Sequence, residues 1–218
     1  RKEPIIIFDV GANVGNYSQF IFDEFSRKSL TFQLFSFEPL KKAYEKLEKR
    51  FQAQYEYVKT YNIGFGNTNG EVTIYANNES SELGSLYYNT DLESLNITMK
   101  SIEKVKISRL SDFCDQNNIQ SIQFLKLDTE GSEIEILRSG RNLINSYKID
   151  FIQFEFGACN VKSQTYMKIF FDLLANNYTI YRILKDGTYH YPKYHPDLEI
   201  FVIGNYLAIS KGINDFIA

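Results

Sequence analysis

The stretch that decides the fold is residues 6–18, Ile-Ile-Phe-Asp-Val-Gly-Ala-Asn-Val-Gly-Asn-Tyr-Ser. A short apolar run ends in an acid, Asp9, and two glycines, Gly11 and Gly15, precede a segment with helical periodicity. This order predicts a buried strand, a tight turn and the N-terminus of a helix. Glycines leave such a turn bare enough for a ligand to approach the backbone.

The charge beside the turn indicates which ligand would suit it. Dinucleotide-binding turns have a similar outline, but their usual spacing is Gly-x-Gly-x-x-Gly, whereas Gly11 and Gly15 are four residues apart. Asp9 stands two residues before the first glycine, where it would repel a pyrophosphate and attract a cationic sulfonium or ammonium. The turn therefore favours S-adenosylmethionine, with NAD as the second choice.

Composition limits the class of protein. The chain has 218 residues, 44% of them apolar, which suits a single domain over residues 1–218 with a substantial core. A net charge of −3 without a block of like charges argues against a nucleic-acid groove and a polybasic membrane patch. No apolar run approaches the roughly 18 residues that span a bilayer. Cys114 and Cys159 are far apart in sequence, so reduced thiols and a cytoplasmic location are expected.

Strand-like and helix-like patterns alternate along the chain, which is typical of a parallel sheet with helices on both faces. We predict an α/β, Rossmann-like fold whose mostly parallel, seven-stranded sheet ends in an antiparallel strand. Asp186-Gly187 signals a turn before that last strand. A polar stretch, residues 77–100, is longer than most connections and is predicted to be a lid or a mobile loop. The expected strands are residues 5–8, 34–37, about 57–63, 124–127, 149–154, about 179–184 and 201–209.

Acidic residues end several of the expected strands, namely Asp9, Glu38, Asp128 and Glu155. Because ligands of open α/β sheets bind beyond the carboxyl ends of the strands, the fold should gather these acids along one edge. Glu38 lies 23 residues beyond Gly15, where a carboxylate can accept hydrogen bonds from both ribose hydroxyls of an adenosine cofactor. Alternatively, Glu38 stabilises the N-terminus of the helix that follows Pro39.

A second motif, Asp128-Thr129-Glu130-Gly131-Ser132-Glu133, follows the strand at 124–127. Thr129 or Ser132 could cap the next helix. Asp128 could hold the cofactor amino group, orient a substrate hydroxyl, or bind a metal together with Glu155. The metal is the less favoured of these roles because the chain lacks a compact ligand motif, so no metal is expected.

Several motifs occur together and in order: FDVGANVGNYS, FSFEP, GSL at 84–86, VKISRLSDF and FLKLDTEGSEIEILRSG. Together they resemble the FkbM-type methyltransferases. These are S-adenosylmethionine-dependent, Rossmann-like class I enzymes, mostly regarded as O-methyltransferases of sugar or natural-product hydroxyls. The resemblance implies that Glu38 binds the ribose, that Asp128 lies near the transferred methyl, and that Ser85 faces the cofactor or the acceptor. It implies that the methionine part is surrounded by Asp9, Gly11, Asn13, Gly15 and Tyr17 or Ser18.

The sequence thus predicts O-methylation of a hydroxyl on a saccharide or related natural-product metabolite, with the oligomeric state left open. Such an acceptor must lose its proton, which calls for a base or a metal. An acid, Asp128 or Glu155, is favoured as this base over His190 or His195, the two histidines of one connection. That connection should emerge at the cofactor edge if the sixth strand is parallel. The alternatives are a NAD-linked oxidoreductase of similar winding and a non-catalytic binding domain with a nucleoside fold.

Overall fold

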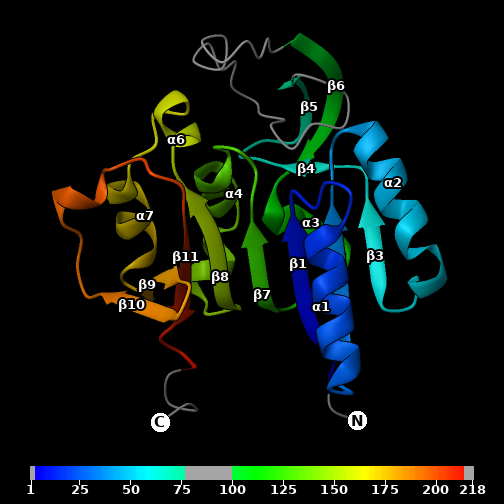
Figure 1. Cartoon of the computed structure of the whole chain (residues 1–218), viewed down its shortest axis with the longest axis horizontal. Coiled ribbons are helices and arrows are strands. Elements are labelled where there is room, and N and C mark those ends of the chain that lie inside the picture. Colours follow the sequence, from blue (N-terminus) through cyan, green and yellow to red (C-terminus); the bar gives the residue numbers. More distant parts are fainter. Residues whose placement is uncertain (1–2, 77–99, 214–218) are drawn as a thin grey trace.

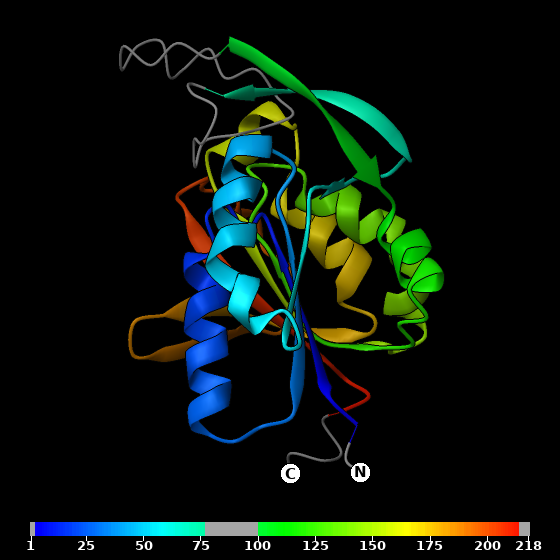
Figure 2. The ribbon, with the colours of Figure 1, turned by 90° about the vertical axis from the view of Figure 1, so that its right-hand side faces the viewer.

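The computed structural model describes residues 3–76 and 100–213. Ser85 and all but the last residue of the predicted polar loop therefore lie outside the described residues. A central eight-stranded sheet is flanked by helices, and a small three-stranded sheet lies beyond its upper edge (Figure 1). The helices α1 and α2 cover one face of the central sheet, and α3, α4, α5 and α7 cover the other (Figure 2).

The central sheet confirms the Rossmann-like expectation, with one more strand than predicted. Its order is β10-β9-β11-β8-β7-β1-β2-β3. The run from β3 to β8 is parallel, and β11 is inserted antiparallel between β8 and β9. The strands are β1 Ile5–Val10, β2 Phe32–Phe37, β3 Val58–Tyr61, β7 Ile122–Leu127, β8 Ile149–Phe156, β9 Tyr178–Leu184, β10 Gly187–Tyr191 and β11 Gly204–Ser210.

The extra strand is β10, which pairs antiparallel with β9. Gly187 follows the turn with a φ of 138°, and the chain then returns along β9 instead of leading directly into the last strand. A tight hairpin of this kind adds an edge strand without changing the order of the others. The sheet therefore has eight strands rather than seven.

The helices bury one apolar face each against the sheet. In α1 and α2 the buried apolar residues are Ile21, Ala43, Leu47 and Phe51, and in α7 Phe170 stacks on Phe154 of β8 with ring centroids 4.4 Å apart. The helices are α1 Asn16–Arg27, α2 Lys41–Phe51, α3 Leu110–Gln116, α4 Glu133–Ser139, α5 Arg141–Asn145, α6 Cys159–Lys162 and α7 Met167–Leu174. Within residues 3–76 and 100–213, none of them is long and apolar enough to cross a membrane.

The small sheet has the order β4-β6-β5, with bounds Gly64–Phe65, Lys100–Ser108 and Gly70–Ala76. It buries Ile74, Val105 and Ile107 against Leu40 and Ala43 at the start of α2. The backbone N–H of Lys41 also donates to Glu103 Oε1 of β6 at 2.6 Å. This sheet is consequently fixed to α2 and stands over the carboxyl ends of the neighbouring central strands (Figure 1).

Candidate active site

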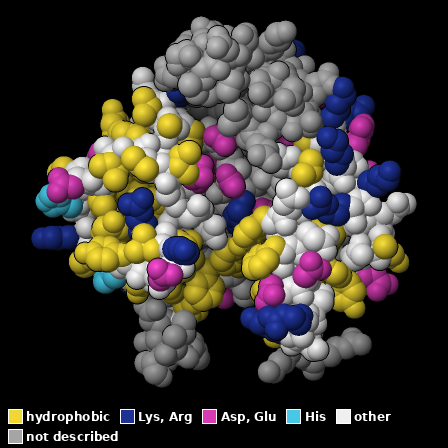
Figure 3. Space-filling model, in the orientation of Figure 1, with side chains coloured by type: hydrophobic (Ala, Val, Ile, Leu, Met, Phe, Trp, Pro, Cys, Tyr) yellow, Lys and Arg dark blue, Asp and Glu magenta, His cyan; other side chains and the backbone are white. Residues whose placement is uncertain are grey.

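A pocket of about 350 Å³ opens at the carboxyl edge of the central sheet. The pocket is formed by the turn after β1 and the start of α1, the residues that follow β2, the small sheet, the end of β7 with the loop after it, and Glu155 near the end of β8. Figure 3 shows acidic side chains gathered in this region. The lining residues that carry the argument are Gly11, Asn13, Tyr17, Glu38, Lys126, Asp128, Glu130, Ser132 and Glu155. The pocket is not lined by Asp9, Gly15, Ser18, His190 or His195, which the sequence also proposed for the site.

The turn after β1 requires both of its glycines, for different reasons. Gly11 has a φ of 83°, and a Cβ at this position would overlap the carbonyl oxygen of Asp128. Gly15 has a φ of 85°, but a Cβ there would meet the side chains of Leu47 and Phe51 of α2 at 2.7 and 2.9 Å. Gly11 thus brings the turn against the end of β7 beside the pocket, whereas Gly15 allows α1 and α2 to pack.

Asp9 lies beneath the turn and is fully buried. Its Oδ2 accepts a hydrogen bond from the Ser18 hydroxyl at 2.6 Å, and Ser18 in turn contacts the Ser36 hydroxyl at 2.8 Å. Its Oδ1 lies 3.4 Å from Lys126 Nζ. Asp9 and Ser18 therefore connect β1, α1, β2 and β7 below the pocket and do not line it.

Lys126 is a pocket residue that sequence reasoning missed. It is 6% exposed, and its Nζ lies 3.0 Å from Asp128 Oδ2 and 4.8 Å from the centre of the Tyr17 ring. Burial alone would lower the pKa of Lys126, but Asp9 and Asp128 outweigh it and raise that pKa. The available signal was a lysine inside the apolar strand pattern Phe-Leu-Lys-Leu, because a charge in a buried strand requires a partner.

Glu38 accepts a hydrogen bond at the start of α2, which is one of the two roles that the sequence left open. Its Oε1 accepts from the N–H of Leu40, which precedes α2, at 2.8 Å, and its Oε2 accepts from Asn13 N–H in the glycine turn at 2.9 Å. It also lines the pocket while being 5% exposed. Burial raises the pKa of Glu38 to about 7, against the lowering effect of the two backbone donors.

Carboxylates from two strand ends meet on the other side of the pocket. Glu155 ends β8, and Glu130 follows β7 with a φ of 55°. Burial, followed by the charges of neighbouring carboxylates, raises the pKa of Glu155 to about 7 and that of Glu130 to about 8. Like charges confined together disfavour ionisation, so this side of the pocket is suited to a cation or to proton exchange.

The loop that carries Glu130 is held by Glu133, which is fully buried. Glu133 Oε1 accepts from the N–H and the hydroxyl of Thr129 at 2.8 and 2.9 Å, and Oε2 accepts from Gly131 N–H at 3.1 Å. The expectation that Thr129 or Ser132 caps α4 is wrong, because the N-cap Ser132 makes no side-chain capping bond. Instead, the carboxylate of Glu133, the first residue of α4, accepts the hydrogen bonds that hold the loop.

The two histidines lie away from the pocket. His190 is exposed on β10, with its ring 5.0 Å from that of Tyr181. His195 is exposed as well, and its Nδ1 lies 3.3 Å from Asp197 Oδ2. Strand β9 is parallel to β8, as the expectation required, but the hairpin at Gly187 turns the chain back before it reaches the pocket. The sequence marks the turn at Asp186-Gly187, but it does not show that a short strand, β10, pairs back on β9 after it.

The parallel sheet with one inserted antiparallel strand, and the pocket beyond its carboxyl edge, define a Rossmann-like methyltransferase fold. The chain belongs to the Methyltransferase FkbM domain family, whose sequence profile matches residues 9–191. It is 24% identical over 146 residues to Methyltransferase 1 of Beauveria bassiana (strain ARSEF 2860), a match that covers 61% of this chain and 57% of that protein.

Two solved structures share the fold. The methyltransferase FkbM of Methylobacillus flagellatus KT superposes with a TM-score of 0.54 at 15% identity, over 94% of this chain and 43% of that one. The METTL16 MTase domain gives a TM-score of 0.50 at 8% identity, over 96% of this chain and 60% of that one. At these identities the likeness concerns the fold. The chain spans about half the length of the relatives it matches.

Proposed function

We propose that this protein is an S-adenosylmethionine-dependent O-methyltransferase acting on a hydroxyl of a saccharide or related metabolite. The observation that carries the proposal is the position of Glu38 at the end of β2, fixed by Asn13 and Leu40 while lining the pocket. Family membership supports methyl transfer, and the acidic lining supports a sulfonium donor over a diphosphate. The hydroxyl acceptor and a cytoplasmic location rest on the family resemblance and the composition.

The residues around the glycine turn fit the adenosyl cofactor. Each Glu38 oxygen accepts one backbone bond and retains a lone pair, so that both can accept from vicinal ribose hydroxyls. Asn13 Oδ1, a buried acceptor in a residue that lines the pocket, has no hydrogen-bond partner among the described residues. Gly11 leaves the turn without a side chain where it meets Asp128. When bound, S-adenosylmethionine supplies the methyl group from its sulfonium.

We assign Asp128 as the base that orients the acceptor hydroxyl and takes its proton. Asp128 lines the pocket where the turn at Gly11 meets β7. Methyl transfer is an in-line displacement, so the acceptor oxygen must be held about 3 Å from the methyl, opposite the sulfur. Lys126 Nζ lies 3.0 Å from Asp128 Oδ2 and acts as a positioning residue that fixes the orientation of the carboxylate. Glu155 is the second candidate base, because its pKa of about 7 is near the working pH.

Calorimetry with S-adenosylhomocysteine and NADH tests the cofactor. We expect the protein to bind S-adenosylhomocysteine and not NADH. Binding of NADH alone would overturn the proposal in favour of the oxidoreductase alternative.

Transfer of a labelled methyl group to a panel of monosaccharides and oligosaccharides tests the acceptor. Asp128→Asn should lower turnover by about 10²–10⁴-fold while S-adenosylhomocysteine affinity is retained. Binding without transfer to any hydroxyl acceptor would favour the non-catalytic alternative.

A further inference from the structure

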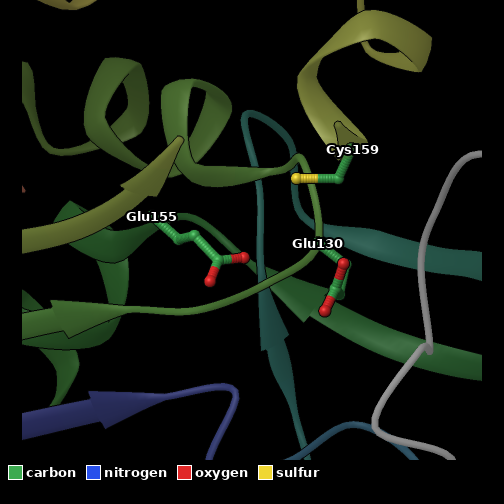
Figure 4. A group of neighbouring side chains, drawn as sticks. All are labelled: Glu130, Glu155 and Cys159. Carbon is green, nitrogen blue, oxygen red and sulfur yellow. The ribbon is translucent and has the colours of Figure 1, made fainter. Parts of the chain in front are cut away.

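Three side chains from separate elements converge beside the pocket, which two of them, Glu130 and Glu155, line. Glu130 comes from the loop after β7, Glu155 from the end of β8, and Cys159 from the first residue of α6. Their carboxylate oxygens and thiol sulfur all lie within 4.8 Å of one another. Figure 4 shows the three side chains directed toward a common space.

A fourth polar group indicates that the pocket beside these side chains is suited to a ligand. Ser132 is 3% exposed, its hydroxyl has no hydrogen-bond partner among the described residues, and it lines the same pocket as Glu130 and Glu155. Burying a hydroxyl without a hydrogen-bond partner costs free energy, and a ligand bound in the pocket would supply that partner.

We propose that Glu130, Glu155 and Cys159 bind a divalent cation of the zinc type, leaving one coordination position open toward the pocket. The donor set favours Zn²⁺ over Mg²⁺ or Ca²⁺, because a thiolate suits a borderline-soft metal and the other two ions prefer oxygen. Zn–S and Zn–O bonds of about 2.3 and 2.1 Å place tetrahedral ligands roughly 3.5 Å apart. The three side chains therefore need to close only slightly.

Three protein ligands and an open position are the arrangement of catalytic rather than structural zinc. The Cys159 thiol loses its proton to solvent when the metal binds, so affinity rises with pH. The site itself depends only on the geometry above. The further step, that an acceptor hydroxyl occupies the open position, rests on the proposed function.

The test uses Co²⁺ as a spectroscopic probe on the metal-free chain, without S-adenosylmethionine. We expect one equivalent to bind, with a thiolate-to-cobalt charge-transfer band in the near ultraviolet that one equivalent of Zn²⁺ removes and excess Mg²⁺ or Ca²⁺ does not. Cys159→Ser should abolish the band. Glu155→Gln, which leaves the thiol in place, should weaken binding by about tenfold or more.

The other cysteine provides the matched control. Cys114 is buried in the core at α3, so Cys114→Ser should retain the band and the affinity. The proposal is overturned if no stoichiometric binding occurs, if the band survives Cys159→Ser, or if Mg²⁺ displaces Co²⁺ at equal concentration. Because S-adenosylhomocysteine binding is measured separately, failure of the metal site is distinguishable from failure of the proposed function.

Discussion

Two acidic regions at the carboxyl edge of the central sheet, one beneath the pocket and one along it, balance their charge in different ways. Beneath the glycine turn, Asp9 and Asp128 flank Lys126, so the fold supplies the cation. Around Glu130 and Glu155, the neighbours that raise the two pKa values are other carboxylates, and Lys126 offsets part of this effect on Glu155. Buried charge requires compensation. The difference indicates that the fold itself balances the charge of the first region, whereas the second is suited to a bound cation or to a mobile proton.

The largest effect is expected from removing the internal cation. Lys126→Met leaves Asp9 buried without its counter-charge, which should destabilise the fold by about 3–5 kcal/mol. Thermal unfolding measures this, and the exposed Lys46→Met on α2 is the control. The double variant Asp9→Asn with Lys126→Met should recover part of the loss. If Lys126→Met alone is as stable as the wild type, Lys126 is not the counter-charge that Asp9 requires, and the contrast between the two regions is wrong.

The next largest effect concerns the carboxylate on the cofactor side. Glu38→Gln keeps the size of the side chain but loses one charged acceptor, so S-adenosylhomocysteine should bind about tenfold or more weakly. Isothermal titration calorimetry measures the change. Glu45→Gln, on the exposed side of α2, should bind like the wild type. Unchanged affinity in Glu38→Gln would remove Glu38 from the ribose site.

A smaller effect should appear in the dependence of stability on pH. The pKa values of Glu155 and Glu130 are about 7 and 8 in the folded protein, above the ordinary value of 4.5. The folded state therefore binds more protons between these limits, and stability present below pH 4.5 is lost as the pH rises through 7 to 8. The melting temperature should fall from pH 5 to pH 8, and Glu155→Gln should flatten the curve. If the melting temperature falls equally steeply with pH in the wild type and in Glu155→Gln, the raised pKa of Glu155 does not contribute to the pH dependence of stability.

The smallest effect is expected at the two histidines. His190→Ala and His195→Ala change exposed side chains outside the pocket, so S-adenosylhomocysteine affinity and methyl transfer should stay within about twofold of the wild type. Kinetic assays of both variants check this. A large loss of turnover in either would return the histidines to the list of candidate bases.

The mostly parallel sheet with helices on both faces could be predicted from the sequence because apolar runs, helical stripes and glycine turns alternate clearly. The acids at strand ends could also be assigned to one edge. The pattern could not show whether the side chain of each acid lines the pocket or is buried below it. Strand β1 is buried on both faces, so its alternation carries no direction, and Asp9 could not be distinguished from a pocket residue.

The partner of Asp9 was hidden for a related reason. Asp9 and Lys126 are paired in the parallel register of β1 and β7. The sequence does not show which residues of two strands that are distant in the chain lie opposite each other. Cys159 was similarly set aside as a reduced thiol, since its approach to Glu130 depends on the path of α6. Long-range register and helix placement are properties of the packed chain, and a single sequence does not display them.

The small sheet has a consequence for how this fold can diversify. Its β5–β6 ladder fixes Ala76 and Lys100 beside each other, and the Lys41–Glu103 bond secures that ladder to α2. The chain therefore leaves and re-enters the small sheet at one place, which belongs to the small sheet and not to the central one. The ladder therefore offers a junction at which chimeras between members of the family can be joined and compared by thermal unfolding.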